Sequence, residues 1–183
     1  MEEIDPEQQA VMTVLEPYFE RFSRTYHEAV ALYNSDVTPR ARADHDNRAA
    51  LAAIYRHSWK GLEREFLDEL GFHFIETRGL FLLNIRDLVV GRAKRVDANG
   101  RHVNADTEQQ RNFDRQLPLP GIPPRAVRVV IGYELDIAFE KVERVIVRRP
   151  APAGRWIAQI VYIEDRYVWE DITPAELPFA ARA

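Results

Sequence analysis

The hydrophobic period of the chain changes at Gly71, and this change limits the fold more than any other feature of the sequence. Before Gly71, apolar side chains recur at steps of three and four residues, which is typical of helices that bury one face. After Gly71 they mostly recur at every second residue, which is typical of strands. Helices followed by strands indicate an α+β protein.

Residues 1–71 predict two helices. The first has an apolar stripe made of Val11, Leu15, Phe19, Phe22, Tyr26, Val30 and Tyr33. Pro17 lies inside this stripe, and we expect a kink or a break near Glu16, because proline lacks an N–H and clashes with the preceding turn. The residues at 34–36 are typical of a loop and predict the end of this helix.

The second predicted helix begins with Thr38 as its cap and Pro39 at its first position. Its stripe comprises Leu51, Ile54, Tyr55, Ser58, Leu62, Phe66 and Leu70. Gly71 is predicted to end it in the left-handed conformation. Because neither helix can bury its stripe alone, we expect the two to form an antiparallel helical hairpin.

Residues 72–172 predict the sheet. The predicted strands are 72–77, 80–85, 88–90, 127–135, 142–147 and 156–163. The strand at 80–85 is apolar on both faces, so we expect it to lie centrally with cover on each side. A short helix is predicted from Asp106 to about Arg115, and the proline-rich residues 117–124 predict an extended connection.

The predicted fold is therefore an N-terminal antiparallel helical hairpin packed on a mostly antiparallel sheet of five to six strands. Residues 1–172 would form a single α+β domain, with a helical part at 1–71 and a sheet part at 72–172. Residues 173–183 are predicted to form a short C-terminal tail.

The composition argues against several classes of protein. The chain has no cysteine, which excludes disulfides, thiolate metal sites and cysteine nucleophiles. The N-terminus is acidic and polar, unlike a signal peptide, and no apolar run approaches the roughly 20 residues of a membrane span. We expect a cytoplasmic protein that does not contact a membrane.

Catalytic patterns are also missing from the sequence. The serines, Ser23, Ser35 and Ser58, lie outside any nucleophile elbow, and the glycines are too dispersed for a phosphate loop. His73 and Glu76 are three residues apart on a predicted strand, so they point to opposite faces. We expect no catalytic residue, no metal and no cofactor.

Two weaker chemical patterns stay open. His27 could face a second histidine, His45 or His57, across the helical hairpin and bind a metal. Carboxylates near 134–140 precede Lys141, but Glu140 and Lys141 are adjacent, whereas a two-metal nuclease needs a residue between them. A polar outer face of the sheet is the preferred interpretation of these carboxylates.

The middle of the chain is its only net-basic part, because residues 72–128 carry ten basic and six acidic side chains. The predicted partner-binding residues are Arg86, Arg92, Lys94, Arg95, Arg101, Arg111 and Arg115, with Arg125 and Arg128 as further basic residues of this region. An Asn99-Gly100 hairpin would place Arg101 across a two-stranded ribbon from Arg92 and Lys94. Acidic residues interleave with this basic region and would neutralise part of it.

We interpret the chain as a non-enzymatic binding or regulatory protein that acts through a protein–protein interface, in a hetero-complex or a homodimer. An antitoxin-like inhibitor or an accessory subunit of a bacterial defence or mobile-element system would fit this description. The alternative is a nucleic-acid-binding protein that uses the basic region 86–128, with or without nuclease activity. A steep loss of duplex affinity with added salt would favour that alternative.

The basic-region hypothesis makes a direct prediction. Replacing Arg92, Lys94, Arg95 and Arg101 together should leave folding intact and remove partner binding, because the four cations would project from a solvated turn. Circular dichroism would measure the fold, and a pull-down would measure binding. Binding that survives the replacement would contradict the hypothesis.

Overall fold

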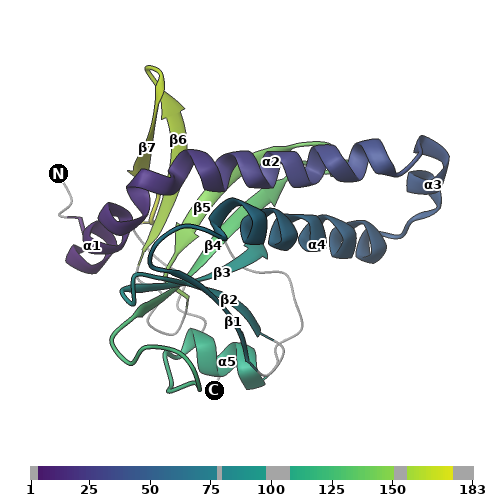
Figure 1. The fold of residues 1–183 in the computed structure, drawn as a ribbon. Coiled ribbons are helices and arrows are strands. Elements are labelled where there is room, and N and C mark those ends of the chain that lie inside the picture. Colours follow the sequence, from purple (N-terminus) through teal and green to yellow (C-terminus); the bar gives the residue numbers. More distant parts are fainter. Residues whose placement is uncertain (1–3, 78–79, 98–107, 151–155, 175–183) are drawn as a thin grey trace.

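A computed structural model describes residues 4–77, 80–97, 108–150 and 156–174. The helices are α1 (Pro6–Leu15), the 3-10 helix η1 (Glu16–Tyr18), α2 (Phe19–Asp36), α3 (Pro39–Asp44), α4 (Asn47–Phe66) and α5 (Glu108–Asp114). The strands are β1 (Phe72–Thr77), β2 (Leu80–Ile85), β3 (Val89–Arg95), β4 (Val127–Leu135), β5 (Val142–Arg148), β6 (Ile157–Ile163) and β7 (Arg166–Asp171). The chain therefore combines helices with a sheet, as predicted (Figure 1).

The predicted break at Pro17 is confirmed. α1 ends at Leu15, and η1 separates it from α2. Asp5 caps α1, because its carboxylate accepts a hydrogen bond of 2.7 Å from the backbone N–H of Glu7. The predicted end of the helix at 34–36 is confirmed, since α2 ends at Asp36, although these residues form its last turn rather than a loop.

The second helical segment is interrupted, whereas the sequence predicted one helix. Thr38 is confirmed as a cap, accepting from the N–H of Ala41 at 3.2 Å. His45 and Asp46 then adopt extended backbone. Asp46 caps α4 by accepting from the N–H of Ala49 at 2.7 Å, and such a side-chain bond competes with helical continuation.

The helical hairpin is confirmed only in part, because each of its two predicted helices is divided into shorter helices. α2 and α4 lie side by side and α3 joins them at their far end, while α1 is a separate helix (Figure 1). α4 ends at Phe66, so Leu70 lies beyond it and is 89% exposed instead of belonging to a buried stripe. Gly71 has the predicted left-handed conformation, with φ +84, but it does not end the helix, because α4 already ends at Phe66.

Within the described residues the sheet has seven strands in the order of the sequence, so the predicted number of five to six is too low. The missed strand is β7, which pairs with β6 through a two-residue turn at Glu164 and Asp165, both with positive φ. Every neighbouring pair is antiparallel except β3 and β4, which are parallel. A parallel pair needs a crossover connection, and α5 lies in it.

The parallel pairing changes the interpretation of residues 92–101. Strand β3 pairs with β4 along its whole length but with β2 only at residues 89–91, so Arg92 and Lys94 lie on a strand of the main sheet that is paired on the β4 side. The Asn99-Gly100 turn and Arg101 lie outside the described residues, as do Arg78-Gly79 and most of the tail beyond 172. The Asn99-Gly100 hairpin therefore stays a prediction, whereas β3 itself joins the sheet through its parallel pairing with β4.

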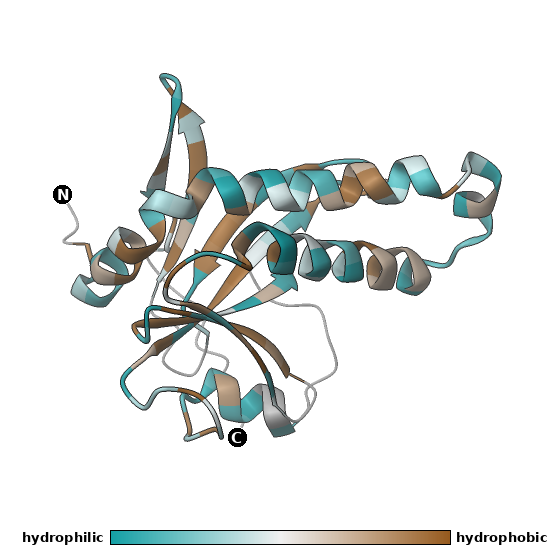
Figure 2. Cartoon of the chain, in the orientation of Figure 1, coloured by the Kyte–Doolittle hydropathy of each residue, from teal (hydrophilic) through white to brown (hydrophobic). Residues whose placement is uncertain are grey.

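Apolar side chains cover the sheet on both faces at β2, as predicted. Leu83 belongs to the large core beneath α2 and α4, whereas Leu82 belongs to a smaller cluster with Phe113 of α5. Figure 2 shows the apolar colouring of the strands between these layers. Across the described ranges, the structure contains no helix with the length and apolar character needed to cross a bilayer.

An aromatic cluster joins the helices to the first strand. The rings of Phe66 and Phe72 are stacked at 4.6 Å, and Tyr18 meets the Phe72 ring edge-on at 4.7 Å. The guanidinium of Arg21 lies 4.3 Å from the centre of the Phe66 ring. α2, α4, η1 and β1 are thereby held to one another at this end of the molecule.

Replacing Phe66 by alanine should lower the free energy of unfolding by about 3–5 kcal/mol, because a fully buried ring and its stacking partner are lost. The matched control is Leu67→Ala, whose side chain is next in sequence but 72% exposed. That change should stay within about 0.5 kcal/mol. Urea unfolding measures both, and equal effects would contradict this account of the core.

Candidate functional site

The structure does not bring the predicted basic residues onto one surface. Arg92 is only 8% exposed and lies 6.0 Å from the Phe113 ring of α5, so replacing it would disturb the packing and is not the change at a solvated turn that the sequence predicted. Arg95 is on the opposite side of β3, with its guanidinium 5.7 Å from the ring of Phe139. Arg111 and Arg115 are exposed at α5 and just after it, and Arg101 lies outside the described residues.

Arg128, a further basic residue of this region, is structural rather than exposed. It is 4% exposed and donates to the backbone carbonyls of Leu117 at 2.5 Å and Asn112 at 3.4 Å. The side-chain amide of Gln116 donates to the backbone carbonyl of Arg128 and accepts from the backbone N–H of Arg128. These bonds attach the proline-rich connection to the start of β4.

Lys94 and Tyr55 lie close together, and burial shifts the pKa of each. The Lys94 ammonium lies 5.4 Å from the centre of the Tyr55 ring. Burial, together with the positive charge of Arg92, lowers the pKa of Lys94 to about 8. Burial raises the pKa of Tyr55, against the lowering effect of Arg92 and Arg56.

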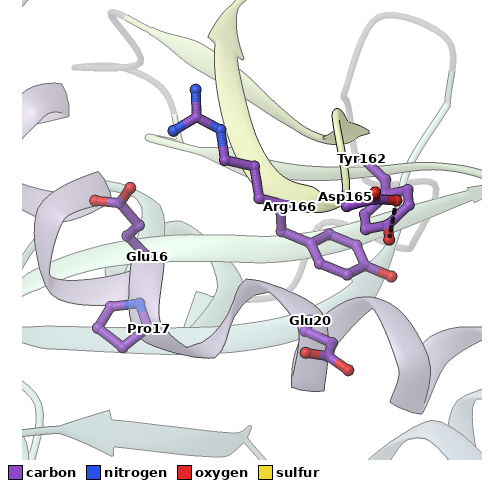
Figure 3. A pocket seen from close by; sticks show the side chains of 7 residues that line it. Glu16, Pro17, Glu20, Tyr162, Asp165 and Arg166 are labelled. Carbon is purple, nitrogen blue, oxygen red and sulfur yellow. Dashed lines mark hydrogen bonds between the residues drawn. The ribbon is translucent and has the colours of Figure 1, made fainter.

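A lysine with a lowered pKa can act as a base or a nucleophile, but it needs a cleft that admits a substrate. Two grooves lie on the described surface, and neither is lined by Lys94. One lies between α2 and α4, has a volume of about 450 Å³ and includes His57. The other lies beside the β6–β7 hairpin, has a volume of about 440 Å³ and includes Tyr162 and Tyr167 (Figure 3).

Arg86, the remaining predicted residue, occupies an unusual turn. Arg86 and Asp87 both have positive φ, at 54° and 57°, and the N–H of Leu88 donates to the carbonyl of Ile85 at 3.1 Å. This is a type I′ turn, in which Asn-Gly is the preferred pair. Asn84 supports the turn, since its side chain donates to the Asp87 carboxylate at 2.6 Å and accepts from the Asp87 N–H at 3.2 Å.

Contacts outside the turn fix Arg86 further. Its N–H donates to the carbonyl of Gly71 at 2.6 Å, and its guanidinium donates to the Tyr18 hydroxyl at 2.7 Å. A Cβ on Gly71 would come within 2.9 Å of the Arg86 side chain, so this close approach favours glycine. The aromatic cluster thus positions an exposed arginine.

Exposed leucines lie on the two segments that the Arg86–Gly71 bond joins. Leu67 is 72% exposed, Leu70 is 89% exposed and Leu88 is 55% exposed. Single exposed leucines are common, whereas contiguous apolar patches mark interaction sites. These three lie within four residues of Gly71 or Arg86, the two residues that the backbone hydrogen bond joins. We name these four residues, Arg86, Leu67, Leu70 and Leu88, the Arg86 surface.

The sequence predicted Arg86 but not its leucines. Leu70 was expected in the buried stripe of a helix, and only the end of α4 at Phe66 exposes it. Leu88 was expected at the start of a strand, whereas β3 begins at Val89. The positive φ values of an Arg-Asp turn also have no signal in the sequence, because this pair is not a preferred hairpin turn.

The carboxylates considered for a metal site have local partners. Glu134 accepts from Arg144 at 2.6 Å, and Asp136 accepts from the backbone N–H groups of Glu140 and Lys141 at 2.7 and 3.1 Å. In the part of the chain that the structure describes, no three His, Asp or Glu side chains are grouped so as to hold a metal ion. His27 and His45 bond within the helical layer, to the Ser23 carbonyl and the Tyr33 hydroxyl.

Comparison with known proteins gives no relative: no family model, no curated protein and no solved structure matches the chain.

The Lys94 environment predicts a measurable titration. Lys94 should titrate at about 8 in nuclear magnetic resonance of labelled lysine Cε, against an ordinary value of 10.5. Arg92→Met should raise that pKa, because a neighbouring positive charge is removed. Titration of Lys94 at its ordinary value would contradict the described burial.

The same shift has a consequence for stability. The folded pKa is lower than the unfolded one, so the unfolded chain binds more protons between about pH 8 and pH 10.5. The free energy of unfolding of the wild type, relative to Lys94→Met, should therefore rise with pH across this window. The same comparison with Lys141→Met, whose side chain is 69% exposed, is the control.

Proposed function

We propose that the protein is a non-enzymatic binding protein that acts through a protein–protein interface at the Arg86 surface. The observation that carries the proposal is an exposed arginine, held in a fixed turn and flanked by three exposed leucines. The cores of protein interfaces are apolar and enriched in arginine. Arginine is also enriched among the few residues that dominate the free energy of binding.

Preorganisation supports this choice of surface. Arg86 is held by its backbone bond to Gly71 and by its side-chain bond to Tyr18, so binding would immobilise little additional freedom. The neighbouring end of α4 is also held, because Arg21 donates to Glu65 at 2.8 Å and to Glu69 at 2.5 Å. A partner would therefore meet a surface that is already ordered.

The chemistry of the surface defines the partner. A guanidinium has five N–H donors, so Arg86 can bind Tyr18 and a partner carboxylate at the same time. Leu67, Leu70 and Leu88 would contact apolar side chains around that carboxylate. An antitoxin-like inhibitor or an accessory subunit of a bacterial system is the class of protein to which we assign this binding.

Nucleic-acid binding has less support. Arg92 and Arg128 are buried, and Arg95 lies on the other side of β3 from Arg92 and Lys94. Among the described residues of the region, the exposed cations are Arg86, Arg111, Arg115 and Arg125, which is a small number for binding along a phosphate backbone.

The interface is tested with Leu70→Asp and Arg86→Ala. Each should weaken partner binding by about 30-fold or more, because truncating a central interface residue costs about 2 kcal/mol. The partner is captured from an extract of the source organism with the wild-type protein, and its affinity for each variant is then measured. Ile137→Asp is the matched control, since Ile137 is an equally apolar side chain that is 98% exposed elsewhere.

The variants distinguish the two functions. Loss of binding in Leu70→Asp and Arg86→Ala, with retention in Ile137→Asp, supports the Arg86 surface. Equal binding by all four proteins contradicts it. Salt-sensitive binding of a random duplex that Arg111→Ala/Arg115→Ala removes would instead support nucleic-acid binding.

A further inference from the structure

Strand β7 forms one edge of the sheet, and its outward backbone groups can be assigned. β6 and β7 are joined by a two-residue turn, so the residues that flank it, Ile163 and Arg166, form a hydrogen-bonded pair. The next such pairs of β7 are at Val168 and Glu170, and the N–H of Ile172 indeed donates to Ile157 at 2.9 Å. The backbone groups of Tyr167 and Trp169 therefore point outward.

This edge lacks several of the usual protections against pairing, although three of its six residues, Arg166, Glu170 and Asp171, are charged. β7 contains no proline and no lysine, and it pairs with β6 through six consecutive residues without a bulge. Among the described residues, no other backbone group bonds the outward N–H and C=O groups of Tyr167 and Trp169. Figure 1 shows the β6–β7 hairpin at the end of the sheet, projecting past α2.

We propose that β7 pairs antiparallel with β7 of a second copy of this chain, about a two-fold axis at Val168. Val168 then faces its own copy, Arg166 faces Glu170 of the partner subunit, and Tyr167 faces Trp169 of the partner subunit. The dimer would join the two sheets into one continuous sheet. This interface is separate from the Arg86 surface and does not rest on the function proposed for it.

The side-chain faces agree with this register. Tyr167 and Trp169 pack against the core on the helix side, so Arg166, Val168 and Glu170 lie on the other face. A two-fold axis perpendicular to the sheet pairs only residues of the same face. The register places both opposite-charge pairs on one face and both aromatic pairs on the other, and each type of pair stabilises antiparallel strands.

The two charges are available for these pairs. Arg166 and Glu170 are exposed, and within the described part of the chain neither forms an ion pair. Arg166 lines the groove at the hairpin together with Glu16 and Glu20 of the helical layer, but it forms no ion pair with either, and its guanidinium extends away from Tyr162 and Asp165 (Figure 3). A partner strand along the outer edge would bring a carboxylate to each arginine.

Other pairings lack this complementarity. If the two-fold axis lay at Trp169 instead of Val168, Glu170 would face Val168 of the second copy. Both Glu170 carboxylates would then lack an arginine opposite them. The opposite edge strand, β1, has His73 and Glu76 on different faces, so no two-fold register pairs them. Self-complementary charge is thus a property of β7 and not of β1.

The test uses charge reversal, with sedimentation equilibrium on the full chain. The wild type should be a dimer that dissociates on dilution. Arg166→Glu and Glu170→Arg should each weaken the dimer by about tenfold to a hundredfold, because two attractive pairs become repulsive. Glu76→Arg, on the edge of β1, is the matched control and should not change association.

Mixing the two single variants is the decisive measurement. One variant then offers two carboxylates and the other two guanidiniums on the facing residues, so a heterodimer should form where neither variant self-associates. The double variant Arg166→Glu/Glu170→Arg should also restore the homodimer. On dimerisation, hydrogen exchange should slow at the outward N–H groups of Tyr167 and Trp169. The N–H of Val168 is already bonded to β6, so its exchange should change less.

Three results would overturn the proposal. They are a wild type that stays monomeric at millimolar concentration, single variants that do not associate when mixed, or a dimer in which Tyr167 and Trp169 exchange as fast as in the monomer. Failure of the Arg86 variants to affect partner binding leaves these measurements unchanged, so the two proposals fail separately.

Discussion

The stacking of Phe66 on Phe72 is the contact on which the arrangement of this end of the molecule depends. It joins the last turn of α4 to the first residue of β1, across the point where the hydrophobic period changes. Tyr18 packs edge-on against the same rings and binds Arg86 through its hydroxyl. The core contact and the exposed arginine are therefore parts of one structure, and loss of the rings would displace the Arg86 surface.

Local patterns predicted the elements more accurately than their connections. The strand 72–77 and the break at Pro17 follow from short-range periodicity and from the geometry of proline. The parallel pairing of β3 and β4 does not, because it depends on a crossover that no local signal specifies. β7 was missed because its short run of residues, from Arg166 to Asp171, is charged at both ends and only partly buried.

The candidate site shows why charge counts alone misplace function. Arg92 and Arg128 contribute to the basic character of the middle of the chain, yet both are buried, since a long apolar stem lets an arginine pack and still donate to backbone carbonyls. Leu70 shows the opposite error. It lies four residues after Phe66, which predicts a buried helical position, but α4 ends at Phe66 and leaves Leu70 exposed. Exposure depends on where each element ends, and element ends are set by caps and turns.

The order of charges along β7 carries more information than their number. For a strand to pair with its own copy, opposite charges must lie at equal distances on either side of one residue and on one face. Arg166 and Glu170 meet this condition about Val168, and Tyr167 and Trp169 meet it on the other face. Binding to an unrelated strand would require complementarity with that strand but no symmetry within β7. The internal symmetry therefore favours a second copy over any other occupant of this edge.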